Sequence, residues 1–323
     1  MNIGFFSNIS CDSYASSTLD NTFTVFKSIN KIFYLIFTST QNSIICFNLE
    51  KFKIICEIKN KFISNIRHFL DKINKRDLIL TVSYKIKDIK IWNIINWECI
   101  LHIKKLNDIG WIYSACIFCY NNINYIITSN YELYFNSEPL QIFNFKGKKI
   151  KEIENSNENT YFVDIYDDKN TSKKYILVGN IGYVKSYDYI KNKLYHKYCD
   201  KSNKGHISLV VKENNKTINL IESCNDGNIR LWDFHKGLLL YKITIDDECL
   251  NGICLWNDKY LFVGCEDGTI KLIDLYNQEI IKNIINDSEE VLTIKSINIP
   301  NFGNCLITQS IGKEELKLWK INY

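Results

Sequence analysis

The sequence predicts an all-β chain that folds as a single seven-bladed β-propeller with four-stranded antiparallel blades. A strand–turn–strand–turn–strand unit occurs seven times, its copies begin 41 to 51 residues apart, and a further apolar stretch lies between consecutive copies. A recurrence of this length, built from strands rather than helices, is typical of a propeller and not of a helical solenoid.

The unit is clearest in ESCNDGNIRLWDFHKGLLLYKI, residues 222–243. Apolar and polar residues alternate with a period of two, which indicates strands that are buried on one side. The polar segment 225–228 contains Asp-Gly and predicts a tight hairpin turn. The second strand ends at Trp232-Asp233, and a turn at Lys236-Gly237 leads into the third strand.

Six other segments repeat this order of strands and turns. They are residues 34–59, 78–104, 125–130 with 139–153, 175–198, 260–284 and 305–320. Aligning the ends of their first strands gives Ser39, Ser83, Ser129, Asn180, Cys224, Cys265 and Ser310, in steps of 44, 46, 51, 44, 41 and 45 residues.

One additional strand per blade is predicted from the apolar stretches between copies, residues 63–69, 113–120, 161–167, 206–211, 249–256 and 291–297. The last copy reaches Tyr323 with one strand missing. We therefore expect part of Asn2–Thr24, within the N-terminal segment 1–24, to supply the outermost strand of the last blade. Residues 1–323 would then form one closed domain, without the long exposed sheet edges that invite aggregation.

The pairs Gly205-His206, Asp226-Gly227 and Trp232-Asp233 fall within one copy and resemble the motifs of the WD-repeat family. The resemblance extends from about Thr22 to Tyr323. It implies a seven-bladed ring whose loops bind other proteins.

The same resemblance implies structural roles for His206, Asp226, Trp232 and Asp233. In the family the His joins a hydrogen-bond network with a turn Asp, a strand Ser or Thr, and the Trp. Asp226 and Trp232 match two of these partners, whereas Glu222 stands in the place of the Ser or Thr.

Composition narrows the classes of function. The chain has 40 basic and 36 acidic residues, and a net charge of +4 is too small to indicate nucleic-acid binding by itself. Twelve cysteines and no secretory-signal pattern favour a reducing compartment, so we expect a cytoplasmic protein and leave a nuclear location open. The longest apolar runs are strand-sized, so no membrane span is expected.

No enzymatic motif is present, and we expect neither catalysis, a cofactor, a metal nor a small-molecule substrate. Cys116 and Cys119 have a Cys-x-x-Cys spacing, but residues three apart on a strand point to opposite faces. They therefore cannot bind one metal together and are expected to be core residues.

The candidate partner-binding residues lie in loops. By family geometry, the loops between blades and those joining second and third strands form one face of the ring. Tyr131, Tyr134 and Phe135 belong to a long loop there, and Trp111 precedes an inner strand near the channel mouth. Aromatic residues dominate interface hot spots, although the three loop aromatics could instead cover their own blade and Trp111 could pack in the core.

Charge is distributed unevenly on this face. Residues 244–250 and 286–291 form two neighbouring acidic loops, whereas Lys85 and Lys87, with Lys104, Lys105, Lys201 and Lys204, lie on other blades. Such a division would orient a charged partner more than it would tighten binding. The lysine-rich composition could also produce the basic part by chance.

The opposite face carries two basic hairpins, residues 71–77 and 145–152. They could contact phosphates, or they could be ordinary solvated hairpin tips. The leading hypothesis is a non-catalytic scaffold or adaptor of a multi-subunit complex, with a peptide or partner protein bound on the loop face. The alternative is an RNA-binding subunit of a ribonucleoprotein that uses the basic hairpins.

Overall fold

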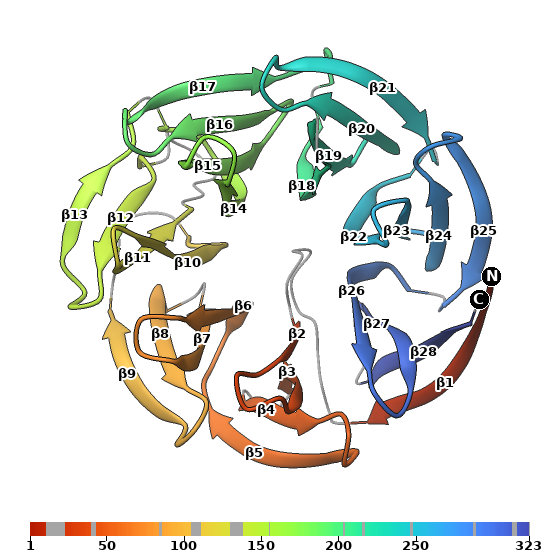
Figure 1. Cartoon of the computed structure of the whole chain (residues 1–323), viewed down its shortest axis with the longest axis horizontal. Helices are drawn as coiled ribbons and strands as arrows, with labels where there is room; N and C mark the ends of the chain where they lie inside the picture. Colours follow the sequence, from red (N-terminus) through yellow and green to blue (C-terminus); the bar gives the residue numbers. More distant parts are fainter. Residues whose placement is uncertain are drawn as a thin grey trace.

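The computed structural model is a closed ring of seven four-stranded sheets around a central axis (Figure 1). It describes residues 1–10, 23–39, 43–83, 86–104, 111–129, 138–154, 156–202, 204–214, 217–245, 248–286, 289–311 and 315–322. Each sheet is a blade in which consecutive strands pair antiparallel, from an innermost strand to an outermost one.

The first three blades take up residues 23–152. The first contains β2 (Phe23–Lys27), β3 (Phe33–Ser39), β4 (Ser43–Asn48) and β5 (Lys53–Lys59). The second contains β6 (Ile63–Asp71), β7 (Arg76–Ser83), β8 (Asp88–Asn93) and β9 (Glu98–Ile103). The third contains β10 (Ala115–Tyr120), β11 (Ile123–Thr128), β12 (Gln141–Asn144) and β13 (Lys149–Glu152).

The remaining four blades complete the ring. The fourth contains β14 (Thr160–Asp168), β15 (Lys173–Asn180), β16 (Val184–Asp188) and β17 (Lys193–Tyr198). The fifth contains β18 (His206–Glu213), β19 (Ile218–Cys224), β20 (Asn228–Asp233) and β21 (Leu238–Thr244). The sixth contains β22 (Leu250–Trp256), β23 (Tyr260–Cys265), β24 (Thr269–Asp274) and β25 (Glu279–Ile285), and the seventh β26 (Val291–Ile299), β27 (Gly303–Ser310), β28 (Glu315–Asn322) and β1 (Asn2–Ser10).

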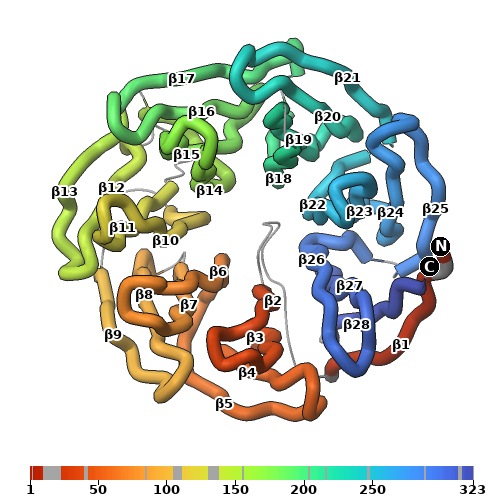
Figure 2. Tube along the Cα trace, in the orientation of Figure 1, coloured from red at the N-terminus to blue at the C-terminus, as the bar shows by residue number. Residues whose placement is uncertain are grey.

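The N-terminal strand closes the ring, which confirms the prediction for the segment Asn2–Thr24. β1 pairs antiparallel with β28, so both termini lie beside one another in the last blade (Figure 2). Ile9 of β1 is buried in a core that also contains residues of the first blade. The two chain ends are thereby tied into one packed unit.

Apolar packing between neighbouring blades forms the core. The described residues contain seven buried clusters, and each joins two adjacent sheets. Five of these clusters contain a large aromatic side chain from the third strand of a blade: Trp92, Phe143, Tyr187, Trp232 and Trp319. At about 25 cal/mol per Å² of apolar surface removed from water, these interfaces are the main stabilising contribution.

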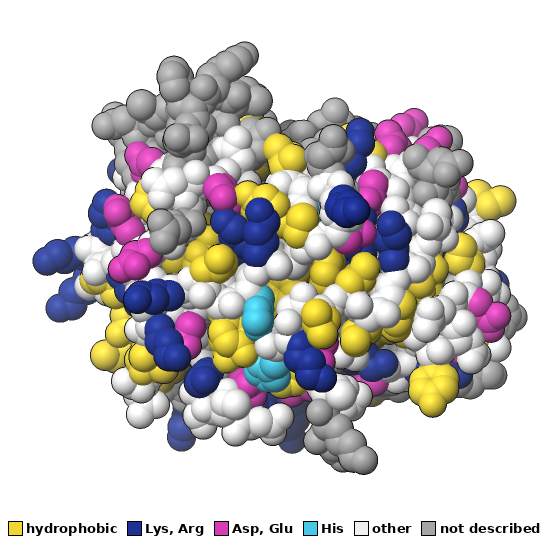
Figure 3. Space-filling view, turned by 90° about the horizontal axis from the view of Figure 1, so that it is seen from above, with side chains coloured by type: hydrophobic (Ala, Val, Ile, Leu, Met, Phe, Trp, Pro, Cys, Tyr) yellow, Lys and Arg dark blue, Asp and Glu magenta, His cyan; other side chains and the backbone are white. Residues whose placement is uncertain are grey.

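Burial follows the position of a strand within its blade. Every residue of β4 is buried, whereas the neighbouring outermost strand β5 is largely exposed. Figure 3 views the ring from its side and shows hydrophobic side chains scattered over the rim with Lys and Arg between them. In β5 burial alternates only at the end of the strand, where Cys56 and Ile58 are half-buried between exposed residues.

Glycine is required where blades approach closely and where hairpins turn. A Cβ at Gly179 would lie 2.6 Å from the carbonyl oxygen of His206 in the next blade. Gly227 and Gly268 have φ values of 75° and 81°, which side chains disfavour, in the Asp-Gly turns between second and third strands. These turns and the loops between blades form one face of the ring, which we call the loop face.

Candidate functional site

Two of the six predicted partner-binding residues fall within the described chain, and both lie on the loop face. Trp111 is 37% exposed in the loop that leads into β10, and its ring contacts that of Tyr113, with centroids 6.2 Å apart. Lys87 lies at φ 54° in the turn between β7 and β8 of the preceding blade. Lys85, Tyr131, Tyr134 and Phe135 lie outside the described residues.

Further apolar side chains are exposed near these two residues in the chain. Phe62 lies in the loop that leads into β6, and Ile86 lies next to Lys87 in its turn; both are exposed. Neither was predicted from the sequence, although Phe62 precedes an innermost strand just as Trp111 does. Exposed apolar residues thus occur in loops of two neighbouring blades, the second and the third.

Residues 246–247 and 287–288 of the two acidic loops lie outside the described residues, and Glu290 of the second loop contacts Asn251, which directly follows the first. In this region Glu266 Oε2 accepts a hydrogen bond from the Cys249 backbone N–H at 3.1 Å, and Glu290 Oε1 accepts one from Asn251 at 2.8 Å. Burial raises the pKa of Glu290; the bond from Asn251 opposes this rise, and the charge of Glu266 adds to it. The sixth and seventh blades therefore form an acidic sector of the loop face.

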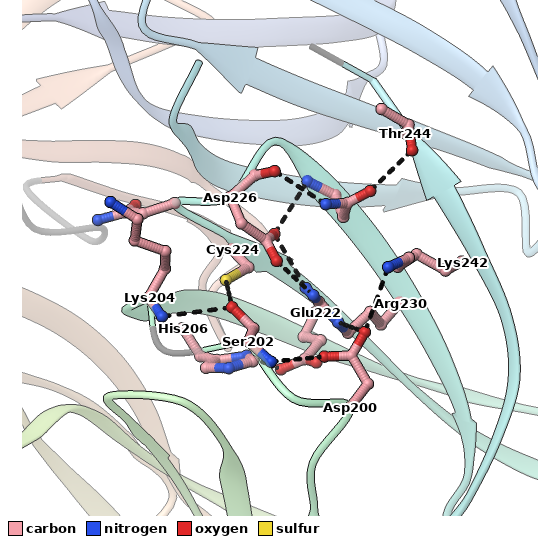
Figure 4. A network of polar contacts seen from close by, with 12 residues as sticks. Asp200, Ser202, Lys204, His206, Glu222, Cys224, Asp226, Arg230, Lys242 and Thr244 are labelled. Atoms are coloured by element: carbon pink, nitrogen blue, oxygen red, sulfur yellow. Dashed lines mark hydrogen bonds and ion pairs between the residues drawn. The ribbon is translucent and has the colours of Figure 1, made fainter. Parts of the chain in front are cut away.

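His206, Glu222 and Trp232 are buried in the fifth blade. Figure 4 shows the wider polar network around His206, which also includes the exposed Lys204 and Lys242. His206 Nδ1 lies 2.5 Å from Glu222 Oε2, and the Trp232 indole N–H donates to Glu222 Oε1 at 3.0 Å. Glu222 therefore provides the acceptor that the family pattern places on a Ser or Thr. The substitution changes the chemistry of the network without removing its connection between imidazole and indole.

Asp226 is paired with a different residue from the one the resemblance implied. Its carboxylate contacts both terminal nitrogens of Arg230, with 3.1 Å between Nη1 and Oδ1, and Arg230 Nε lies 2.8 Å from Asp200 Oδ2. Burial would raise the pKa of Asp226, but the hydrogen bonds and charge of Arg230 outweigh this and hold it well below its usual range. Asp233 accepts from the Lys236 backbone N–H at 2.9 Å in the following turn.

Two other blades bind their tryptophans through neutral groups. The Trp92 indole N–H donates to Thr81 Oγ1 at 3.1 Å, and Asn60 Nδ2 donates to the same oxygen at 3.2 Å. In the seventh blade Trp319 donates to Thr308 at 3.1 Å, and Thr308 donates to Asn286 Oδ1 at 2.8 Å.

This correspondence between blades was not predicted from the sequence. A usable signal was present, because Thr81, Glu222 and Thr308 each stand two residues before the aligned strand end and 10 or 11 residues before the Trp.

The described residues provide little for metal or redox chemistry. Cys116 is buried and Cys119 is half-buried, at positions three apart on β10. Burial raises the pKa of the Cys116 thiol, which disfavours the thiolate that a metal requires. Across the described ranges, no group of three or more His, Cys, Asp or Glu could hold a metal ion.

No family model matches the chain. A segment of 92 residues, 28% of the chain, is 24% identical to U3 small nucleolar RNA-associated protein 21 homolog of Schizosaccharomyces pombe and covers 10% of that protein. A segment of 90 residues, 28% of the chain, is 29% identical to Autophagy-related protein 16 of Arabidopsis thaliana and covers 17% of it. The matched segments therefore span less than a fifth of either relative.

In the ranges that the structure describes, no helix has the length and hydropathy needed to cross a bilayer. The fold and the partial matches agree with the expectation raised by the sequence motifs. The chain is a seven-bladed β-propeller that resembles the WD-repeat proteins in its repeat, its ring closure and its tryptophan-centred hydrogen bonds.

Proposed function

We propose that this chain is a non-catalytic scaffold that binds a peptide or a partner protein on its loop face. The exposure of Phe62, Ile86 and Trp111 in loops of neighbouring blades is the observation that supports this most. Tryptophan is among the residues most enriched in interface hot spots, and Trp111 lies in a loop with exposed apolar residues in the loops before and beside it.

Charge supports a preferred orientation for the partner. Lys87 lies on the second blade, whereas Glu266 and Glu290 lie at the sixth and seventh. A partner with an acidic end and a basic end would be oriented by these sectors. The buried networks around Trp92, Trp232 and Trp319 would hold the loops between them in place.

The test is affinity capture of the whole chain, identification of the proteins recovered, and titration of one purified partner. The double variant with Trp111→Ala and Ile86→Ser is expected to bind that partner with roughly tenfold lower affinity, as truncation of a hot spot does. Ile190→Ser, at an exposed residue of the turn after β16 on the other face, serves as the matched control. Equal affinity of the loop-face variant and the control would contradict the proposed site.

RNA binding remains the second candidate because one partial relative is named an RNA-associated protein. Lys146, Lys148 and Lys149 are exposed in the hairpin between β12 and β13, on the face opposite the loop face. An interface of this kind would lose affinity for single-stranded RNA steeply as salt rises, whereas the aromatic loop-face site would not. Titration with RNA and with the partner at two salt concentrations separates the candidates.

A further inference from the structure

Closure of the ring leaves one sheet edge on each blade, along its outermost strand. These strands are β5, β9, β13, β17, β21, β25 and β1, and they lie on the outside of the ring (Figure 1). The edge of a sheet offers backbone N–H and C=O groups to another chain, and native proteins usually protect it with charged residues or keep the strand short. The residues of each outermost strand thus determine whether its edge is protected.

One of the seven edges lacks this protection. Each of the other six outermost strands contains a Lys or a Glu, whereas β1 (NIGFFSNIS) contains no charged residue. β1 is also the longest of the seven, at nine residues, and no described strand pairs with its outer side. It is therefore the best template on the ring for an added strand.

Exposed aromatic side chains stand along the same edge. Phe5 is 55% exposed, and its ring contacts that of Trp319 with centroids 5.6 Å apart. Phe6 is 46% exposed, is the extra residue of a β-bulge, and contacts Phe302 with centroids 5.4 Å apart. An added strand would remove part of both phenylalanine rings from water, which favours apolar side chains in that strand.

A lysine lies behind this edge, across a glycine. Gly4 is paired with Lys320 of β28, and paired residues of antiparallel strands project from the same face. A Cβ at Gly4 would meet no atom within 4 Å, so nothing fills the space between Lys320 and the edge.

The charge of Lys320 is within reach of an added strand. Lys320 is exposed, and none of the ion pairs between described residues includes it. A residue added opposite Gly4 would lie two strand spacings, about 10 Å, from Lys320. A Glu side chain on the added strand and the lysine side chain span this distance together.

We propose that the edge of β1 binds an extended segment of a partner protein as a fifth strand of the seventh blade, with an acidic residue opposite Gly4 and apolar residues beside it. Backbone groups of Asn2–Phe5 would provide the main-chain hydrogen bonds, and Lys320 would select the acidic residue. The β1 strand of a second copy does not meet this requirement, because it has no acidic residue. The edge lies on the rim of the ring, so this binding does not depend on the loop-face site.

The first test uses two heptapeptides of alternating Thr and Val that differ only at the central residue, which is Glu or Lys. We expect the Glu peptide to bind the full chain roughly fivefold more tightly. It should also slow hydrogen exchange at the backbone amides of Asn2–Phe5 and not at those of β17. Equal affinities, tighter binding of the Lys peptide, or slower exchange at another outermost strand would overturn the proposal.

Charge reversal at Lys320 tests the role of this side chain. In Lys320→Glu the preference should reverse, so that the Lys peptide binds roughly fivefold more tightly. Lys193→Glu, at an exposed residue of the outermost strand β17, makes the same change in net charge and should keep the preference for the Glu peptide. Equal behaviour of the two variants would contradict selection by Lys320.

Methylation of peptide nitrogens tests strand addition itself. Alternate N–H groups of an added strand face its neighbour, so methylating one alternate set in the Glu peptide should abolish binding, and methylating the other set should leave it nearly unchanged. Equal losses for both sets would contradict strand addition. Dimerisation of the full chain that the Glu peptide disrupts would assign the edge to a second copy and overturn the proposal. Trp111→Ala should leave peptide binding unchanged, so this site and the loop-face site fail or succeed separately.

Discussion

The fifth and second blades hold the same kind of indole group in different ways. In the fifth blade, Trp232 donates to a buried carboxylate that also contacts an imidazole. In the second blade, Trp92 donates to the hydroxyl of Thr81, which also accepts from an amide. Both arrangements satisfy the indole, but only the first places a carboxylate in the core, where desolvation is costly.

The fifth blade also contains Arg230, which is buried between the carboxylates of Asp200 and Asp226. The second blade has Lys90 in the corresponding strand, and Lys90 donates to the neutral Asn60 at 2.8 Å. The difference indicates that the blade whose residues most resemble the WD-repeat motifs also depends most on buried charge. Mutations should therefore affect the two blades by different amounts.

The largest effect is expected for Arg230→Met. Removing this cation leaves two carboxylates without their main partner, which typically costs about 3–5 kcal/mol of unfolding free energy. Lys90→Met is the matched change in the second blade and should cost only about 1 kcal/mol, since its partner is neutral. Urea unfolding of both variants measures the difference, and equal losses would show that charge does not distinguish the blades.

The difference in stability between the two variants should depend on pH. The hydrogen bonds and charge of Arg230 more than offset burial and lower the pKa of Asp226 and of Asp200 in the folded state. A carboxylate whose pKa is lowered by folding stabilises the folded state at pH values above its unfolded pKa of about 4. This stabilisation is lost as the pH falls through the folded pKa. In Arg230→Met the loss of folding stability in acid should be smaller than in the wild type, whereas in Lys90→Met this loss should match the wild type. Urea midpoints at several acidic pH values test both expectations.

A smaller effect is expected when the two polar partners in the fifth blade, Glu222 and His206, are replaced by neutral residues. Glu222→Thr alone leaves His206 without its partner, and His206→Asn alone leaves Glu222 with only Trp232. The double variant removes the carboxylate and the imidazole together. It should therefore cost about 2 kcal/mol less than the sum of the single changes, a coupling typical of residues in contact. A strictly additive result would contradict a direct coupling between His206 and Glu222.

Much of the fold could be predicted from the sequence because local patterns determine it. Asp226-Gly227 and its counterparts specify turns, and alternation specifies which strand faces are buried. The closing strand β1 followed from the one strand missing after Tyr323. None of these inferences required knowledge of contacts between distant residues.

The networks and the register of the closing strand depended on such contacts. Glu222 differs in residue type from the Ser or Thr of the family pattern, although the Trp232 indole requires only an acceptor. Asn60 was not predicted because it lies three residues before Ile63, the position that corresponds to His206. The register of β1 on β28 was not predicted either, because these strands come from opposite ends of the chain and pair only when the ring closes.

The smallest effect is expected for Thr308→Val in the seventh blade. Valine keeps the shape of threonine but removes the hydroxyl that accepts from Trp319 and donates to Asn286. No charge is left unpaired, so Thr308→Val should lower the free energy of unfolding by about 1 kcal/mol. Thr308→Ser should retain most of the wild-type stability because the hydroxyl remains. Thr81→Val should behave alike, since Thr81 occupies the same position in the second blade. A loss at Thr308 as large as that of Arg230→Met would mean that the position in the blade, and not the charge, determines how strongly each tryptophan is held.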